Sequence, residues 1–134
     1  MKQLSIIMSN RRGVIAEITE ALAARNINIE NINAQSFEDK AIITVEVNDY
    51  ELALSELIRL GKTNDFQVIA EDAIIIKLPN EPGALAKISR RFTNANIELF
   101  SIRFIQRNES FGLVAISTER SEIALKLLKD VLVS

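Results

Sequence analysis

The feature that most constrains the fold of this chain is an internal repeat. Residues 9–18 are repeated at an offset of seventy by residues 79–88, and the correspondence continues through both copies. The offset grows to seventy-one further on, which we assign to one residue inserted in the turn that follows Ile102. Such self-similarity indicates a duplicated structural unit. The sequence therefore predicts two copies of one module, with domains at 1–70 and 71–134. The matched pairs are Asn10 with Asn80, Gly13 with Gly83, Ala16 with Ala86, Ile18 with Ile88, Leu22 with Phe92, Asn26 with Asn96, Ile27 with Ile97 and Ile32 with Ile102.

Composition excludes several classes of function. The chain has no histidine and no cysteine, which removes imidazole bases, thiolate nucleophiles, disulfides and ordinary zinc sites. Its net charge of −2 gives no strong positive field for nucleic acid or an anionic membrane. No apolar run approaches the roughly 20 residues that span a bilayer. We therefore expect a non-catalytic protein without metal ion or cofactor, and the absence of cysteine fits the cytoplasm.

The first copy has the element order β-α-β-β-α-β. Alternating apolar residues predict strands, and apolar residues at three- and four-residue spacing predict helices. Asp49 is a candidate N-cap, and Gly61 is expected to end the helix that follows. A change of phase between Ile29 and Ile32 indicates a β-bulge. The expected elements are 2–9, 13–25, 27–37, 41–47, 50–60 and 66–70.

The second copy repeats this order up to its last strand. Only 131–134 remain after its second helix, too little for a full sixth element. The order predicts an α+β fold of two ferredoxin-like modules with antiparallel sheets, the second lacking a full fourth strand. We expect the strand at 66–70 to pair with the strand at 73–78, so that the two sheets share an edge. The elements expected in this copy are 73–78, 82–93, 97–107, 112–118 and 121–130.

Each copy carries one motif ahead of its first helix. The motifs are Asn10-x-x-Gly13 and Asn80-x-Pro82-Gly83, each followed after the helix by an Asn-Ile pair. Motif and element order together resemble the ACT domain over essentially the whole chain. The resemblance implies a regulatory module that binds small molecules, mostly amino acids, at interfaces between paired domains. It also implies a homodimer or larger assembly, with an enzyme or regulator of amino-acid metabolism as partner.

The resemblance further implies a ligand site at the turn between the first strand and the first helix. Glycine there lets backbone N–H groups approach a carboxylate closely. A second polar position is Asn28 in the first copy, supplied to a neighbouring domain, and Glu98 in the second, where an anion would repel a carboxylate. Arg11 and Arg12 either pair with a ligand carboxylate or are simply solvated. The candidate residues are Asn10, Arg11, Arg12, Gly13, Val14, Asn28, Asn80, Gly83, Ala84 and Leu85.

Two classes of function remain open. One is a sensor that binds an amino acid and alters a partner, which the first copy favours because it keeps Asn10, Gly13 and Asn28. The other is a pairing module that acts as a regulatory subunit without binding a ligand, which Glu98 favours for the second copy. RNA binding is disfavoured, because the predicted central strands at 4–8 and 42–47 carry no aromatic residue for base stacking.

Overall fold

A computed structural model of the protein describes residues 1–133. Its internal contacts form two compact units. The first is Lys2–Glu71, and the second begins at Asp72 and also includes Met1. Each unit is an α+β module with one antiparallel sheet, as the sequence predicts.

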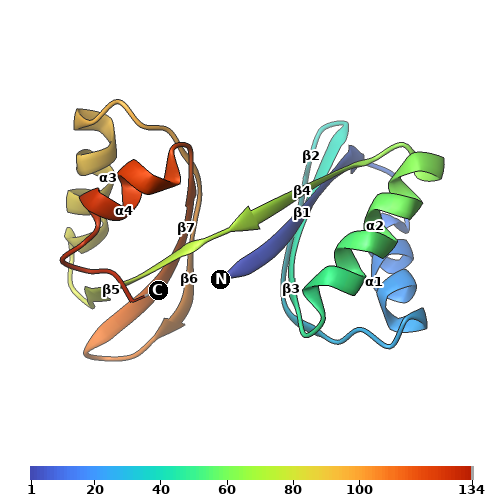
Figure 1. Ribbon diagram of the computed structural model, residues 1–134, viewed down its shortest axis with the longest axis horizontal. Helices are drawn as coiled ribbons and strands as arrows, with labels where there is room; N and C mark the ends of the chain where they lie inside the picture. Colours follow the sequence, from blue (N-terminus) through green and yellow to red (C-terminus); the bar gives the residue numbers. More distant parts are fainter. Residues whose placement is uncertain (134) are drawn as a thin grey trace. The chain divides into compact units, whose positions relative to one another are not determined.

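The first unit has a four-stranded sheet with two helices on one face (Figure 1). Its strand order is β2-β3-β1-β4, so the first strand of the chain lies inside the sheet. Alternation along β1 sends Leu4, Ile6 and Met8 into the core, where α1 adds Ile18 and Leu22. The elements are β1 (Lys2–Ser9), α1 (Val14–Ala24), β2 (Ile29–Phe37), β3 (Lys40–Val47), α2 (Tyr50–Asn64) and β4 (Gln67–Asp72).

The two ends of α2 test two sequence predictions. Asp49 is confirmed as the N-cap, because its carboxylate accepts a hydrogen bond from the Leu52 N–H at 3.2 Å. The expected end at Gly61 is wrong, since the helix runs on to Asn64 and Asp65 takes the left-handed conformation at φ 56°. Gly61 is instead a point of close approach. A Cβ there would lie 2.8 Å from the Phe66 carbonyl oxygen.

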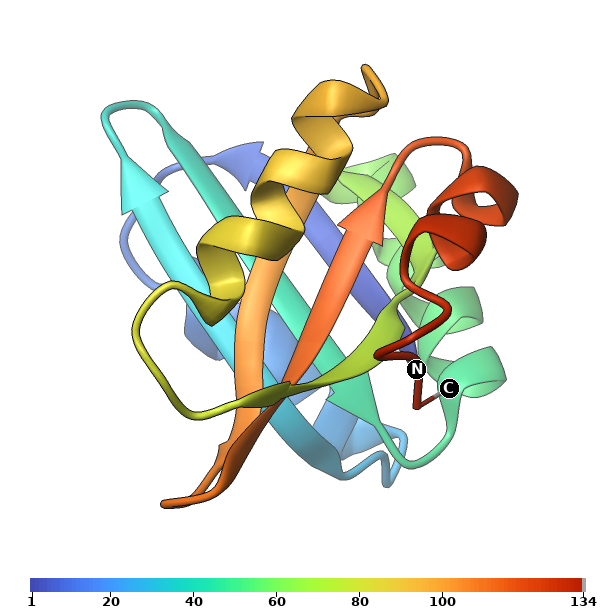
Figure 2. The same cartoon turned by 90° about the vertical axis from the view of Figure 1, so that its left-hand side faces the viewer.

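The second unit has a three-stranded sheet in the order β5-β7-β6, with both helices on one face (Figure 2). The apolar side chains of this face pack on Ile88 and Phe92 of α3 and on Ala124 of α4. The elements are β5 (Ile74–Pro79), α3 (Ala84–Asn94), β6 (Leu99–Arg107), β7 (Phe111–Thr118) and α4 (Ser121–Leu127).

The chain after α4 partly takes the place of the missing fourth strand. Leu132 forms an isolated antiparallel bridge with Ile76, and the Val133 N–H donates to the Ile75 carbonyl at 2.8 Å. The expected sharing of an edge between the sheets is therefore wrong. β4 hydrogen-bonds beside β1 in its own sheet, while the free side of β5 is met by the end of its own unit.

The β-bulges explain the irregular offset of the repeat. The predicted bulge in β2 is confirmed between Ile29 and Asn31. A further bulge in β6 lies between Phe104 and Gln106 and leaves Ile105 as the extra residue. The insertion that changes the offset therefore lies in this strand, and our assignment of it to the following turn is wrong. An extra residue is accommodated in a strand because the bulge restores the alternation beyond it.

Candidate functional site

The turn between β1 and α1 ends at a left-handed glycine, directly before a helix that no side chain among residues 1–133 caps. Gly13 has φ 86°, in the left-handed region that favours glycine, and no side chain within residues 1–133 caps the helix there. The first N–H groups of a helix have no intrahelical partner. Val14 turns its side chain into the core and is 4% exposed, and its backbone N–H donates to the Arg11 carbonyl at 3.4 Å. This end of α1 is therefore suited to an anionic group.

A pocket of about 160 Å³ lies in front of this turn. Pockets for drug-sized ligands measure about 300–1,000 Å³, so the size suits a smaller molecule. The strand–helix turn supplies one wall, and strands β2 and β3 supply the other. The lining residues include Asn10, Arg11, Gly13, Ala34, Ser36 and Ala41.

Asn10 holds the turn to the hairpin between β2 and β3. Its side-chain N–H donates to the Glu38 carbonyl at 3.2 Å, and its backbone N–H donates to the Asp39 carbonyl at 2.8 Å. One of the two N–H donors on the amide is thus engaged within the protein. Asn10 therefore has a structural role that the sequence did not indicate.

The two arginines of the turn differ. The guanidinium of Arg11 lies 2.6 Å from the Glu17 carboxylate, an ion pair between half-exposed groups. Arg12 is exposed. Arg11 is therefore paired within the protein, with Glu17 of the first turn of α1, and its contact with a ligand carboxylate stays a prediction.

The second unit repeats this arrangement with its own residues. Gly83 has φ 87°, and the Asn80 side chain donates to the Asn108 carbonyl at 2.8 Å. The pocket here is larger, about 260 Å³, and Ala84 and Leu85 line it together with the turn. The equivalence of Asn10 and Asn80 thus extends from the sequence to the hydrogen bond.

Asn28 and Glu98 do not join the turns of their own units. Asn28 precedes β2, whereas the Asn10 turn meets the far end of that strand, about 30 Å away for nine residues. The Asn28 N–H donates to the Asn48 side chain at 2.9 Å, and the Glu98 N–H donates to the Glu119 carboxylate at 2.9 Å.

The Glu98 N–H thus has a partner within its own unit, whereas the expected repulsion concerns the Glu98 carboxylate. This hydrogen bond is the main cause that lowers the pKa of Glu119, helped by Arg120 and opposed by burial. The effect of the Glu98 carboxylate on a site completed by a neighbouring domain stays a prediction.

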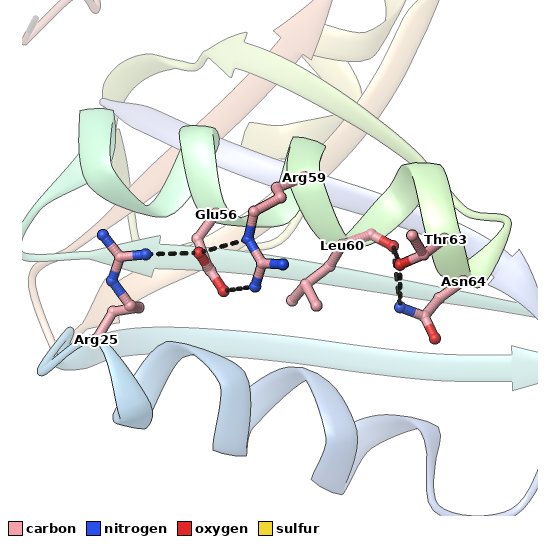
Figure 3. A network of polar contacts seen from close by, with 6 residues as sticks. All are labelled: Arg25, Glu56, Arg59, Leu60, Thr63 and Asn64. Atoms are coloured by element: carbon pink, nitrogen blue, oxygen red, sulfur yellow. Dashed lines mark hydrogen bonds and ion pairs between the residues drawn. The ribbon is translucent and has the colours of Figure 1, made fainter.

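A charged cluster that the sequence did not reveal joins α1 to α2 in the first unit (Figure 3). Glu56 is 5% exposed, and its carboxylate lies 2.9 Å from Arg25 and 2.6 Å from Arg59. The hydrogen bond from Arg59 is the main cause that lowers the pKa of Glu56. Burial opposes the shift, and the charges of Arg59 and Arg25 add to it. The pair of Glu56 with Arg59 has the i, i+3 spacing of neighbours on a helix, whereas the contact with Arg25, 31 residues away, depends on the fold and has no sequence signal.

The second unit ties its helices together with different residues. The Arg91 guanidinium of α3 donates to both oxygens of Asp130, at 2.6 Å and 2.9 Å, and to the Leu127 carbonyl. The hydrogen bond from Arg91 is the main cause that lowers the pKa of Asp130. None of these charged residues lines a turn pocket. We infer that both groups of ion pairs stabilise the packing of the helices.

The described part of the chain gives no sign of two other kinds of site. Residues 1–133 contain no cluster of side chains that could hold a metal ion. None of the helices described is long and apolar enough to cross a membrane.

The comparisons with known proteins agree with this architecture. The model of the ACT domain family matches residues 2–61. A search of curated protein sequences gave no significant match. The crystal structure of a Bacteroides thetaiotaomicron protein is 30% identical, with a TM-score of 0.74, 98% of this chain covered and 90% of that one.

Two further crystal structures share the fold at lower identity. The ligand-free regulatory subunit of aspartate kinase from Thermus thermophilus is 20% identical, with a TM-score of 0.62, 96% of this chain covered and 91% of that one. The corresponding subunit from Thermus flavus is 20% identical at a TM-score of 0.62, with 96% and 90% covered. The fold and its strand–helix turns define a pair of ferredoxin-like modules. This chain belongs to the ACT-domain family.

Proposed function

We propose that the chain is a non-catalytic regulatory protein of the cytoplasm that binds an amino acid at its strand–helix turns. It comprises two ACT domains, residues 1–70 and 71–134. The observation that carries the proposal is the pocket in front of Gly13, where an uncapped helix start and the Arg11 side chain line one wall. Backbone N–H groups and a guanidinium are both suited to a carboxylate.

Regulation then follows from the way such a pocket is completed. Residues around Asn28 from a neighbouring domain close the site in a dimer or larger assembly, so that the ligand favours one arrangement of the domains. A coupling of about 1–3 kcal/mol is typical of such linkage. That proteins with this fold serve as regulatory subunits of aspartate kinase supports a partner enzyme in amino-acid metabolism.

A thermal-shift panel of free L-amino acids and nucleobases tests the proposal. A ligand present at about a hundred times its Kd stabilises the folded protein by about 2.7 kcal/mol, which is readily seen. We expect at least one amino acid to raise Tm and no nucleobase to do so. If no amino acid raises Tm, the proposal is wrong.

Two substitutions then locate the site by calorimetric titration. Asn10→Ala is expected to weaken binding about five- to 150-fold, because a polar group of the ligand loses its hydrogen bond to the part of the Asn10 amide that Glu38 does not engage. Asn80→Ala is the matched control for stability, since it removes the same hydrogen bond from the other hairpin. Equal affinity of wild type and both variants would place the ligand elsewhere.

Glu17→Gln tests whether Arg11 holds the carboxylate. The Glu17 carboxylate pairs with the Arg11 guanidinium at 2.6 Å and competes with a ligand carboxylate for it. Its removal is expected to tighten binding about 1.5- to fivefold, the scale of an exposed ion pair. Unchanged affinity would mean that Arg11 does not contact the ligand.

A second candidate function has its own support. The side-chain amides of Asn10 and Asn80 each donate to a carbonyl of the neighbouring hairpin, a role that needs no ligand. A pairing module that regulates an enzyme without binding a small molecule would keep both asparagines. In that case the amino-acid panel leaves Tm unchanged, while Asn10→Ala and Asn80→Ala still lower it.

A further inference from the structure

The two turn pockets have different walls where the sheet lines them. In β2, Ala34 lies opposite Ile43, and in β6 the equivalent position opposite Val114 is Phe104. Beyond the bulge at Ile105, the strands come back into correspondence. Ser36 lies opposite Ala41 in the first unit, and Arg107 lies opposite Gly112 in the second. All four sheet positions thus differ, and three of them line both pockets: Ala34, Ser36 and Ala41 in the first unit, and Phe104, Arg107 and Gly112 in the second.

The three residues in the second unit form one contact group. A Cβ at Gly112 would lie 2.9 Å from the Phe104 ring, so the aromatic side chain packs directly on the glycine. The Arg107 guanidinium lies 4.1 Å from the centre of the same ring, a cation–π contact. Because a planar guanidinium stacked on a ring loses much of its freedom, Arg107 is held in position beside the pocket.

The charges of the two pockets differ as well. Arg11 of the first pocket already faces the Glu17 carboxylate. Within residues 1–133, Arg107 has no ion-pair partner, so its charge is available to a ligand. Glu81 is the acidic residue of the second pocket, and the first pocket has none. The second pocket thus offers a cation on the sheet and an anion on the turn.

We propose that the two pockets take different amino acids, and that Arg107 makes the second one selective for an amino acid with an acidic side chain. The inference rests on the proposed function, since it assigns the ligand's α-carboxylate to the turn. The side chain then points to the sheet, where Arg107 pairs with its carboxylate and Glu81 accepts from the ammonium group. The first pocket, with Ala34 and Ser36 at the matching positions, takes an amino acid with a small neutral side chain.

The pocket volumes fit this assignment. The second pocket measures about 260 Å³ and the first about 160 Å³, so the longer side chain goes to the larger space. Phe104 acts as a positioning residue for Arg107 and contributes apolar surface for the methylene groups of the ligand.

Calorimetric titration of the whole chain tests the inference with L-glutamate and L-aspartate against L-glutamine and L-asparagine. These pairs match in size and differ in charge. We expect the acids to bind more tightly than their amides, and Arg107→Ser to weaken the acids about ten- to 150-fold, the scale of a hydrogen bond to a charged group. Arg107→Ser should leave binding of L-alanine and L-serine unchanged, because these enter the first pocket. Arg90→Ser is the control, since it removes the same charge from an exposed position on α3 outside the pocket.

The outcomes separate this inference from the proposed function. Acids that bind no better than their amides, or that lose equal affinity in Arg107→Ser and Arg90→Ser, overturn the selectivity and leave an amino-acid sensor standing. Absence of binding by every amino acid overturns both. Arg107→Lys keeps the positive charge but lacks the planar guanidinium. Its affinity for the acidic amino acids is expected to lie between those of wild type and Arg107→Ser. Circular dichroism of each variant confirms that the sheet has formed.

Discussion

Replacing Gly13 by alanine tests the backbone conformation on which the turn depends. Gly13 has φ 86°, and a Cβ built there meets nothing within 4 Å. The substitution therefore adds no steric clash with other residues. What it changes is the cost of holding an L-residue in the left-handed region.

Two opposed effects set the size of the loss. The left-handed conformation costs an L-residue about 1–2 kcal/mol. Replacing glycine also restricts the unfolded chain, which offsets about 0.4–1 kcal/mol of that cost. The expected net loss is about 1 kcal/mol, which lowers Tm by about 4–8 °C for a unit of this size.

Urea unfolding followed by circular dichroism measures this loss. Gly83→Ala is the matched variant, because it has φ 87° and an equally open position, and it should lose the same amount. Gly13→Asn should lose less, since asparagine visits the left-handed region more readily. If Gly13→Ala is as stable as wild type, the turn does not hold a left-handed residue in solution. A much larger loss would show that the Cβ meets a neighbour.

Three further predictions concern the folded units. Glu56→Gln should lower stability most at neutral pH. Arg59 and Arg25 hold the pKa of that carboxyl below its ordinary range, so the stabilisation is present above that range and is lost as pH falls through the lowered pKa. Urea unfolding at neutral and acidic pH checks this, and a difference that grows in acid would contradict it. Asp49→Ala removes the N-cap and should cost about 0.5–2 kcal/mol in the same assay, with Asp49→Asn close to wild type. Phe92→Ala leaves a cavity at a side chain 1% exposed and should cost about 3–5 kcal/mol, seen as faster amide hydrogen exchange in the second unit.

Much of the fold follows from periodicity and from the repeat. The order of helices and strands along the chain, the Asp49 cap and the bulge after Ile29 follow from local sequence patterns. The end of α2 could not be predicted in this way. Gly61 looks like a helix terminator in sequence, whereas its function depends on the approach of Phe66, a contact set by tertiary packing. The pairing of β5 with the end of the chain was missed for the same reason, because a few residues without a strand pattern still form backbone hydrogen bonds.

The candidate site was predictable only in part. The turn residues follow from the motif, and the glycines at 13 and 83 adopt the conformation that the motif requires. The wall supplied by β2 and β6 was missed, although aligning Ala34 with Phe104 would have shown that the copies differ there. Beyond Ile105 the two strands can be aligned only if the bulge is known, because the extra residue shifts the correspondence by one position, so that Ser36 matches Arg107. The contact of Glu56 with Arg25 has no signal in the sequence, because the two residues lie 31 positions apart.

The hydrogen bonds of Asn10 and Asn80 also bear on how this motif is interpreted in other chains. Each asparagine fastens its turn to a hairpin 28 residues away. Loss of that bond would loosen the fold, so selection for stability alone preserves the residue after a duplicated copy has lost its ligand. The motif therefore records common ancestry more faithfully than it records binding. The side chains of β2 and β6 that line the pockets do not hold the turn in place. Divergence between duplicated sensors should therefore be sought at these positions.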